Sequence, residues 1–496
     1  MNYLSLILII PLAGAGLLAL FEQFKKLLSK IKICSDCLNH ILANVIALGV
    51  FILAVLSIFI GDLRTLFALQ DGLLEYGLVQ AILITIFSFL VWMAVLFSVD
   101  YMKGKEGLGF YYALILTLLS GLSTVVMADN FFTLFIGWEM FALSAYTLVA
   151  FERMKRGAVE ASLKYFIMST AGSLLVLLGT ALTYGVFGTL NFEDLRGLSM
   201  TSNPLTGVII AIFVVGFGVT AAMLFLNAWL PDAHSHAPST ISALLSGIVV
   251  KAGAYGIYRT IFWAFGDSDV MLGSSSVFIA WLGILTMFEG NFLVFAQFWR
   301  KDIIDFKRIL AYSTTVHLGY VVLGIGAGTE LGISASVFHI LTHSLGKGAL
   351  FLLSGTLIAA IGSRDIRDMK GLGRRSPIVG VVLTVGLLSL GGIPITGGFM
   401  SKLLVILSTF DGLHSNAMNI ILVILAILNS LLALGGYLYI LKIIVFDPPE
   451  DKAEDKLKVP IYEAIPLILM VVIIIIIGVW PTGVFDKIVE AIASLW

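Results

Sequence analysis

The chain contains 496 residues, of which 30 are Lys or Arg and 31 are Asp or Glu, so its formal net charge is −1. Charged residues make up 12% of the sequence and hydrophobic residues 59%, and the mean hydropathy is +1.03. An ordinary soluble protein has about 25% charged residues. A soluble fold of this size has too little interior to bury so much apolar surface. These values exclude a water-soluble globular enzyme, and the lack of a basic stripe excludes a nucleic-acid-binding protein.

Fourteen apolar runs along the chain approach the length of a membrane-spanning helix, which needs about 20 apolar residues. The first run has neither the basic start nor the cleavage site of a signal peptide, so it is predicted to be a span. A short interfacial helix with Trp496 as an anchor is expected over 484–496, and 447–458 is expected to be a charged loop. The fourteen runs lie at 3–20, 41–60, 78–99, 109–127, 130–150, 160–185, 207–230, 239–263, 274–298, 308–327, 331–361, 377–408, 418–445 and 461–481.

The basic residues are distributed unevenly among the loops between these runs. With the N-terminus outside, the inner loops hold 21 of the 30 Lys and Arg residues and the outer side holds three. The positive-inside rule therefore favours fourteen spans in the cytoplasmic membrane, with both termini outside. Arg259 and Lys442 lie near helix ends and are expected to reach the headgroups. Six basic residues fall within predicted helices: Lys164, Lys251, Arg259, Lys347, Lys402 and Lys442.

Two cysteines, Cys34 and Cys37, occur in a CSDC run on the predicted inner side. Two thiols do not complete a tetrahedral metal site, so a loop without special chemistry is favoured over a redox or metal role. The sequence contains no Walker, GxGxxG or HExxH motif and no cysteine set for haem or an iron–sulfur cluster. No cofactor or metal is therefore expected in this chain.

Ionisable residues are predicted in the middle of several spans. A charge in hydrocarbon is unfavourable unless it faces a partner or water. A set spread over most of the central helices therefore indicates a polar axis through the middle of the protein. Glu289, in MFEGNF, lies toward one end of its run and is left without a role. The set consists of Lys164, Lys251, Lys347, Lys402, Glu139, Glu289, His317, His339 and His343.

Two of these residues, Glu139 and Lys164, lie on adjacent predicted helices. The simpler interpretations are a carboxyl neutralised by burial and a lysine that reaches the interface. A Glu–Lys pair would instead lower the cost of both charges and couple two proton-binding groups. Lys251 lies in mid-helix with no acidic residue within two turns. A buried lysine of this kind can exchange a proton near neutral pH, as a relay needs, and a fixed structural cation is the alternative.

His339, His343 and Lys347 share one helix face, because positions i, i+4 and i+8 span about 80°. A metal site is the weaker interpretation, since lysine is a poor ligand and no carboxylate or thiol shares the face. His317, on the preceding predicted helix, is placed to bridge toward this cluster or to make a structural hydrogen bond. Lys402 follows LGGIPITGGFMSK, whose glycines and proline predict a helix broken in mid-membrane. Broken helices beside buried charges are typical of transporters.

The motifs together resemble the antiporter-like membrane subunits of respiratory complex I and its relatives. These relatives include Mrp-type cation/proton antiporters, membrane-bound hydrogenases and membrane-bound sulfane sulfur reductases. The resemblance covers residues 130–405, and the fourteen predicted spans extend it to the whole chain. It is carried by GWEMFALSAYTLV, EASLKYFIMST, NAWLPDAHSHAPSTISALLSGIVVKAGAYGIYR, FKRILAYSTTVHLGY, HILTHSLGKGALFLLSG and GGIPITGGFMSKLLV.

The resemblance implies an all-α polytopic fold with two inverted five-helix repeats, formed by helices 4–8 and 9–13, in which helices 7 and 12 are broken. The corresponding segments are 1–108 for helices 1–3, 109–263 and 274–445 for the two repeats, and 446–496 for helix 14 and a short C-terminal helix. It also implies a mid-membrane proton relay. The matching positions are Glu139, Lys164, Lys251, His317, His339, His343, Lys347 and Lys402.

One relay position departs from the resemblance. The family usually has a lysine on helix 7, nine residues before the Trp of WLPDAH, where this chain has Thr220. The expected proline nearer that Trp is replaced by Phe225. A threonine hydroxyl does not titrate near neutral pH. Either Lys164 or a water wire replaces the missing cation, or the N-terminal half no longer conducts and the C-terminal half keeps the proton route.

The expected function is transport of H⁺, or exchange of Na⁺ and H⁺, as a subunit of a multisubunit membrane respiratory complex. The expected partners are other membrane subunits and a peripheral redox module that carries iron–sulfur clusters or other redox centres. The alternatives are a stand-alone Mrp-like Na⁺/H⁺ antiporter and a partly non-conducting structural subunit. Six buried ionisable groups besides the altered position argue against a pure scaffold.

Overall fold

The computed structural model of the protein describes residues 6–25, 34–61, 63–64, 72–196, 198, 203–266, 269–413, 415–449 and 456–494. Helices make up nearly all of these ranges, and twelve are long and apolar enough to cross a membrane. The predicted all-α polytopic fold is confirmed at this level. Backbone contacts divide the chain into two compact units: unit 1 holds residues 1–220, 236–241 and 255–271, and unit 2 holds 221–235, 242–254 and 272–496.

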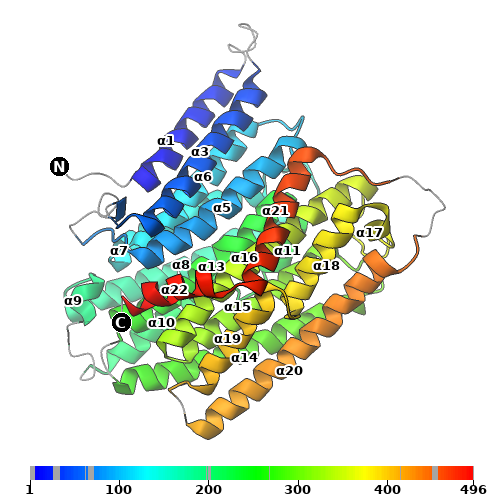
Figure 1. Ribbon diagram of the computed structural model, residues 1–496. Helices are drawn as coiled ribbons and strands as arrows, with labels where there is room; N and C mark the ends of the chain where they lie inside the picture. The colour runs from blue at the N-terminus through cyan, green and yellow to red at the C-terminus, as the bar shows by residue number, and fades with distance from the viewer. Residues whose placement is uncertain are drawn as a thin grey trace. The chain divides into compact units, whose positions relative to one another are not determined.

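Unit 1 is built mainly from eight helices within the described ranges (Figure 1). Close helix contacts are possible because small residues meet at the interfaces. A Cβ atom added at Gly172 would lie 2.9 Å from the Gly216 carbonyl oxygen, so these two backbones touch. The helices are α1 (Leu6–Gln23), α3 (Ser35–Phe59), α5 (Leu78–Tyr101), α6 (Leu108–Met127), α7 (Phe131–Val149), α8 (Ala158–Phe187), α9 (Phe192–Arg196) and α10 (Leu205–Thr220).

Unit 2 is organised around α16 (Glu330–Ile361), which packs against α15, α18, α19, α21 and α22. A buried apolar cluster that includes Met287, Tyr320 and Val405 fills the space between α14, α15 and α19. The central helix therefore carries its histidines and lysine inside the unit. The other helices are α14 (Asp269–Phe298), α15 (Phe306–Gly326), α17 (Leu372–Arg375), α18 (Pro377–Gly391), α19 (Gly397–Phe410), α20 (Asn416–Leu441), η4 (Lys442–Phe446), α21 (Ile461–Val479) and α22 (Thr482–Ala493).

Two of the predicted spans are interrupted, as expected for helices 7 and 12. The run at 207–230 forms α10, an irregular stretch at 221–229, and α11 (Leu230–His236). The run at 377–408 forms α18 and α19, with an irregular stretch at 392–396. These pieces are shorter than a full span, which is why twelve long candidates appear and fourteen spans remain a prediction.

The run at 239–263 is helical but irregularly wound. It consists of α12 (Ser239–Leu244), the π-helical segment η2 (Leu245–Val249), α13 (Val250–Tyr258) and a second π-helical segment, η3 (Arg259–Ala264). A π-helical turn shifts the backbone hydrogen bonds by one residue and is frequent at functional sites. This shift determines which carbonyl group faces Lys251.

The structure also shows the CSDC run and the predicted C-terminal helix. The CSDC run is not a loop, because α3 begins at Ser35, and Cys34 and Cys37 form a disulfide. The short C-terminal helix is present as α22. Residues on which other predictions depended lie outside the described ranges: Lys26, Lys30, Lys32, Lys452 and Trp496.

Arg259 does not reach the membrane interface, and this prediction was wrong. Its side chain is 1% exposed, because the guanidinium lies between the rings of Phe192 and Trp263, at 4.7 Å and 4.4 Å. Its Nη2 donates to the Ala128 carbonyl at 2.6 Å. Carboxylates of Glu75 and Asp129 lie 3.6 Å and 3.9 Å from the guanidinium. The arginine is therefore a buried structural cation of unit 1.

Candidate functional site

The break in helix 12 shapes one end of the candidate site. Gly392 and Ile395 have φ values of +78° and +76°, a conformation that glycine adopts without strain and isoleucine does not. A Cβ atom added at Gly398 would lie 1.9 Å from the Ser389 carbonyl oxygen, so only glycine fits there. The sequence GGIPITGG therefore ends one helix and starts the next, one turn before Lys402.

Lys402 is 3% exposed and lies in a cradle formed beside this break. Its Nζ is 3.1 Å from Ser430 Oγ and 5.1 Å from the centre of the Tyr320 ring. The Tyr320 hydroxyl donates to the Ala426 carbonyl at 2.9 Å, which fixes the ring. A side chain at Gly392 would enter the cradle, with Cβ 3.5 Å from the Lys402 Nζ. The ammonium is held by a hydroxyl and an aromatic face, without a carboxylate among its contacts in the described ranges.

Three histidines from α15 and α16 lie together in unit 2, as the sequence predicted for His317 and the His339/His343 face. His317 Nδ1 is 3.1 Å from His339 Nε2, and the His317 and His343 rings are 4.6 Å apart. His339 Nδ1 lies 2.9 Å from Ser401 Oγ, on the residue before Lys402. All three rings are buried, at 2% exposure or less. Donor and acceptor roles in this chain of rings depend on the tautomers.

Lys251 joins this histidine cluster from the irregular helix. Its Nζ is 2.7 Å from His343 Nδ1 and also donates to the Ser246 carbonyl. That carbonyl belongs to the π-helical segment η2, and π-helical turns are frequent at functional sites. The local winding therefore places a backbone acceptor opposite the lysine.

Lys347 lies on the same face of α16 and is turned toward α15. Its Nζ donates to the Leu310 carbonyl at 2.7 Å and to the Ser313 hydroxyl. The ring of Phe351 lies 5.9 Å from the same nitrogen. Lys347 and Lys251 are both 0% exposed, so neither ammonium contacts bulk solvent.

These residues form two hydrogen-bonded groups of buried proton-binding side chains, whose nearest rings, His317 and His343, have centroids 4.6 Å apart. Direct hydrogen-bond distances link Lys251 to His343 and link His317 through His339 to Ser401. Imidazole can accept a proton on one nitrogen and donate from the other. Such a set can pass protons between neighbours without a metal. Within the described ranges, no three His, Cys, Asp or Glu side chains come together as metal ligands.

The predicted site residues of unit 1 are placed differently. Lys164 Nζ is 2.9 Å from Glu160 Oε1 one turn earlier on α8, and its side chain is 50% exposed. Glu139 lies on α7, and its Oε1 atom is buried with no hydrogen-bond partner in the described ranges. Thr220 is 3% exposed at the last residue of α10. A Glu139–Lys164 pair stays a prediction.

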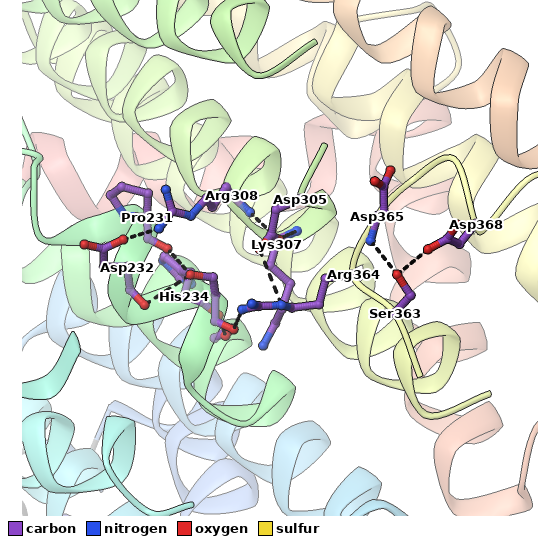
Figure 2. Close-up of polar contacts among 12 residues, drawn as sticks. Pro231, Asp232, His234, Asp305, Lys307, Arg308, Ser363, Arg364, Asp365 and Asp368 are labelled. Carbon is purple, nitrogen blue, oxygen red and sulfur yellow. Dashed lines mark hydrogen bonds and ion pairs between the residues drawn. The ribbon is translucent and has the colours of Figure 1, made fainter. Parts of the chain in front are cut away.

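A cluster at the ends of α11 and α15 was not predicted from the sequence. Arg308 pairs with Asp232, and Figure 2 shows these two side chains facing each other. Asp305 caps α15 by accepting from the backbone N–H groups of Lys307 and Arg308, at 2.9 Å and 3.2 Å. Arg364 Nη1 donates to the Ser235 carbonyl at 2.5 Å. The only sequence signal was that Asp232 and Arg308 belong to motifs used for the family resemblance.

The adjoining loop before α17 carries its own ion pair. Burial raises the pKa of the Asp365 carboxyl, but hydrogen bonds from Arg367 outweigh this effect and leave the pKa below its ordinary value. Ser363 Oγ donates to Asp368 at 2.5 Å and accepts from the Asp365 N–H at 3.2 Å (Figure 2). The loop that leads from α16 is therefore fixed by local polar contacts.

Two further polar groups were not predicted to take part in the site. His234 is 0% exposed, neither ring nitrogen has a hydrogen-bond partner in the described ranges, and the ring stacks on Phe351 at 4.6 Å. Glu289, for which the sequence indicated no role, accepts from the backbone N–H of Phe225 at 3.2 Å and from Asn227 Nδ2 at 2.7 Å. Both contacts of Glu289 lie in the 221–229 break, and no sequence spacing indicates them.

Residues 128–432 match the family described as NADH:quinone oxidoreductase/Mrp antiporter, TM. The chain is 30% identical over 396 residues to F420H2 dehydrogenase subunit N of Methanosarcina mazei, with 77% of each chain covered. It is 33% identical over 303 residues to a Na⁺/H⁺ antiporter subunit of Alkalihalophilus pseudofirmus, with 61% of this chain and 59% of that one covered. The chain therefore belongs to the NADH:quinone oxidoreductase/Mrp antiporter family.

Solved structures agree with this assignment. A chain of the membrane-bound sulfane sulfur reductase, an archaeal respiratory membrane complex, superposes with a TM-score of 0.84 and 28% identity, over 99% of this chain and 97% of that one. A chain of the Mrp complex from Dietzia sp. has the same fold, with a TM-score of 0.81 and 22% identity over 99% and 96% of the two chains. The protein is thus an antiporter-like subunit of the type found in such multisubunit membrane complexes.

Proposed function

We propose that this chain moves protons, alone or in exchange for Na⁺, through a relay of buried side chains in unit 2. The observation that carries the proposal is the proximity of two buried hydrogen-bonded pairs: Lys251 meets His343 at 2.7 Å, His317 meets His339 at 3.1 Å, and the His317 and His343 rings lie 4.6 Å apart. Lys347 and Lys402 flank this set and are equally buried. Ionisable residues are unfavourable in a membrane interior unless they pair or carry ions.

The proposed topology comprises fourteen spans in the cytoplasmic membrane with both termini outside. Its two inverted five-helix repeats would occupy 109–263 and 274–445, preceded by three helices in 1–108 and followed by 446–496. The twelve long apolar helices and the two interrupted runs support this count. Helices broken in corresponding positions of two repeats are a feature of transporters.

Unit 1 is proposed to conduct protons less well than unit 2. Thr220 offers a hydroxyl where the family has a lysine, and a hydroxyl does not exchange protons near neutral pH. Lys164 is half exposed and bonded to Glu160. Glu139 would then lack the helix-7 cation that the family provides. Thr220→Lys is expected to restore a cation to this half.

The chain is proposed to work with other membrane subunits and with a peripheral module that supplies the driving force. Iron–sulfur clusters or other redox centres would lie in that module. Copurification from native membranes tests this part: a protein with iron–sulfur or nickel sites is the expected companion, and the type of redox centre defines the complex. Recovery of the chain with no stoichiometric companion contradicts it.

A stand-alone Na⁺/H⁺ antiporter is the second candidate, supported by the similarity to the Na⁺/H⁺ antiporter subunit of Alkalihalophilus pseudofirmus. The discriminating experiment reconstitutes the purified chain and the intact complex into separate liposomes. A pH-sensitive dye follows H⁺, and a radioactive tracer follows Na⁺. Transport that needs the complex and its electron donor supports the subunit function. Exchange by the chain alone supports the second candidate, and no ion movement in either preparation contradicts both.

Gly392→Ala is expected to reduce transport by roughly tenfold or more, because small displacements of a reacting group are costly. The new Cβ would lie 3.0 Å from Lys402 Cδ, and alanine at φ +78° adds about 1–2 kcal/mol of backbone strain. The matched control is Gly435→Ala in α20, where an added Cβ meets nothing within 4 Å. Equal transport by the two variants would mean that the cradle around Lys402 does not matter.

A further inference from the structure

The break in helix 7 is built without the residues that usually stabilise one. Phe225 stands where the family has a proline, and Ala222 and Phe225 have φ values of +50° and +61°. Such values are unfavourable for residues with side chains, most of all for bulky ones. By contrast, the break at 392–396 contains Pro394 and begins at Gly392. The stretch at 221–229 therefore needs support from outside itself.

Helix α14 supplies this support with two side chains one turn apart. Both carboxylate oxygens of Glu289 lie 3.2 Å from the Phe225 backbone nitrogen, and Oε2 also accepts from Asn227 Nδ2 at 2.7 Å. Thr286 Oγ1 accepts from the Leu224 N–H at 3.1 Å. The consecutive N–H groups of Leu224 and Phe225, which lie in the helix break, thus donate to side chains of α14. Hydrogen bonds to a charged carboxylate are about twice as strong as those between neutral groups, so Glu289 is the stronger of the two anchors.

A cavity of about 370 Å³ opens beside this carboxylate. The charged and titratable side chains in its wall, besides Glu289, are Asp232, Arg308 and Tyr312. Asp232 and Arg308 form an ion pair with each other. Within the described ranges Glu289 has no ion pair, and its contacts are the N–H group of Phe225 and the amide of Asn227. A carboxylate in a cavity wall with neutral partners is a group that can exchange a proton with the cavity.

We propose that Glu289 couples proton binding to the conformation of the helix-7 break, as a positioning residue for the transport function proposed above. The ionised carboxylate holds the Phe225 N–H and the Asn227 amide. A proton that enters through the cavity forms an O–H bond on one carboxylate oxygen and removes the negative charge, which weakens both contacts. The break then relaxes, and loss of the proton back to the cavity restores it. The chain that lacks a helix-7 lysine thereby keeps a proton-sensitive group in contact with this helix, on α14.

Hydrogen exchange of the break tests the coupling without any assay of transport. Amide exchange at 224–227, corrected for the intrinsic effect of pH, is measured by mass spectrometry on the intact complex. In the wild-type protein, exchange at these amides is expected to rise roughly tenfold when the carboxyl is protonated, which reflects the loss of charge-assisted hydrogen bonds. Exchange in the 392–396 break serves as the internal control. Protection at 224–227 that is independent of pH overturns the proposal, and this result requires no variant.

Glu289→Gln keeps the size of the side chain and one acceptor but cannot ionise. The variant is expected to exchange at 224–227 as fast as the protonated wild type at every pH, and to lose the pH-dependent part of transport. Glu330→Gln, at an exposed carboxylate in the first turn of α16, is the matched control and is expected to match the wild type. If Glu289→Gln keeps the wild-type exchange profile, the coupling is wrong. Loss of transport in every protein, with the exchange profiles as expected, would instead contradict the proposed function.

Discussion

Lys251→Ala is expected to lower transport by roughly 100-fold, the usual contribution of a positioned proton donor or acceptor. Lys251 adds an ammonium group to the three histidines of the cluster, with its Nζ 2.7 Å from His343 Nδ1. Its removal leaves His343 Nδ1 without its lysine partner and interrupts the set. The measurement is proton uptake by liposomes that contain the intact complex, driven by its electron donor.

Lys442→Ala is the matched control, because Lys442 is an exposed lysine at the end of a predicted span. This control is expected to transport at the wild-type rate. Subunit composition is checked for both variants, since a complex that fails to assemble says nothing about the relay. An assembled Lys251→Ala complex that transports within about twofold of the wild type would contradict a proton-transfer role for this lysine.

Arg259→Met is expected to have the largest effect on stability, a loss of about 3–5 kcal/mol, as when one partner of a buried ion pair is removed. The side chain is 1% exposed and serves Glu75, Asp129 and the Ala128 carbonyl at once. Methionine fills much of the volume but leaves the Ala128 carbonyl without its hydrogen-bond donor and the two carboxylates without their ion-pair partner. Thermal unfolding of the detergent-solubilised chain measures the effect, and Arg300→Met, at an exposed pair with Asp302, is the control.

The loss of folding stability in Arg259→Met is expected to depend on pH. Burial raises the pKa of Asp129 to about 6, although Arg259 opposes this shift. Because this pKa lies above its unfolded value, Asp129 favours folding at low pH, and this contribution is lost as the pH rises through about 6. Without Arg259 the pKa rises further, so the variant is expected to be destabilised more at about pH 8 than at about pH 5. A loss of stability that is equal at both pH values would mean that Arg259 does not affect the pKa of Asp129.

The sequence was most informative where composition alone determines structure. Apolar runs of helical length predicted the long helices, and the glycines around Pro394 predicted the break before Lys402. The spacing of His339, His343 and Lys347 correctly predicted one face of a buried helix. These features depend on local hydrophobicity and backbone preference, which residues carry wherever they lie in the fold.

Contacts between distant segments were not predictable in this way. Lys164 was expected at a relay and is half exposed beside Glu160, whereas Arg259 was expected at the interface and is buried between two aromatic rings. The anchors of the helix-7 break come from Thr286 and Glu289, more than 60 residues later in the chain. Which side chains meet across helices depends on packing, and no single-sequence pattern encodes it.

Paired measurement of proton transport by the Lys402→Ala and Glu139→Ala complexes tests the central claim most directly. Both variants remove an ionisable group of a predicted span: Lys402, buried in unit 2, and Glu139, half-buried in unit 1. Transport through unit 2 predicts that Lys402→Ala loses most of the activity and that Glu139→Ala keeps most of it. An equal loss in the two variants would contradict the asymmetry, and full activity in both would contradict the relay itself.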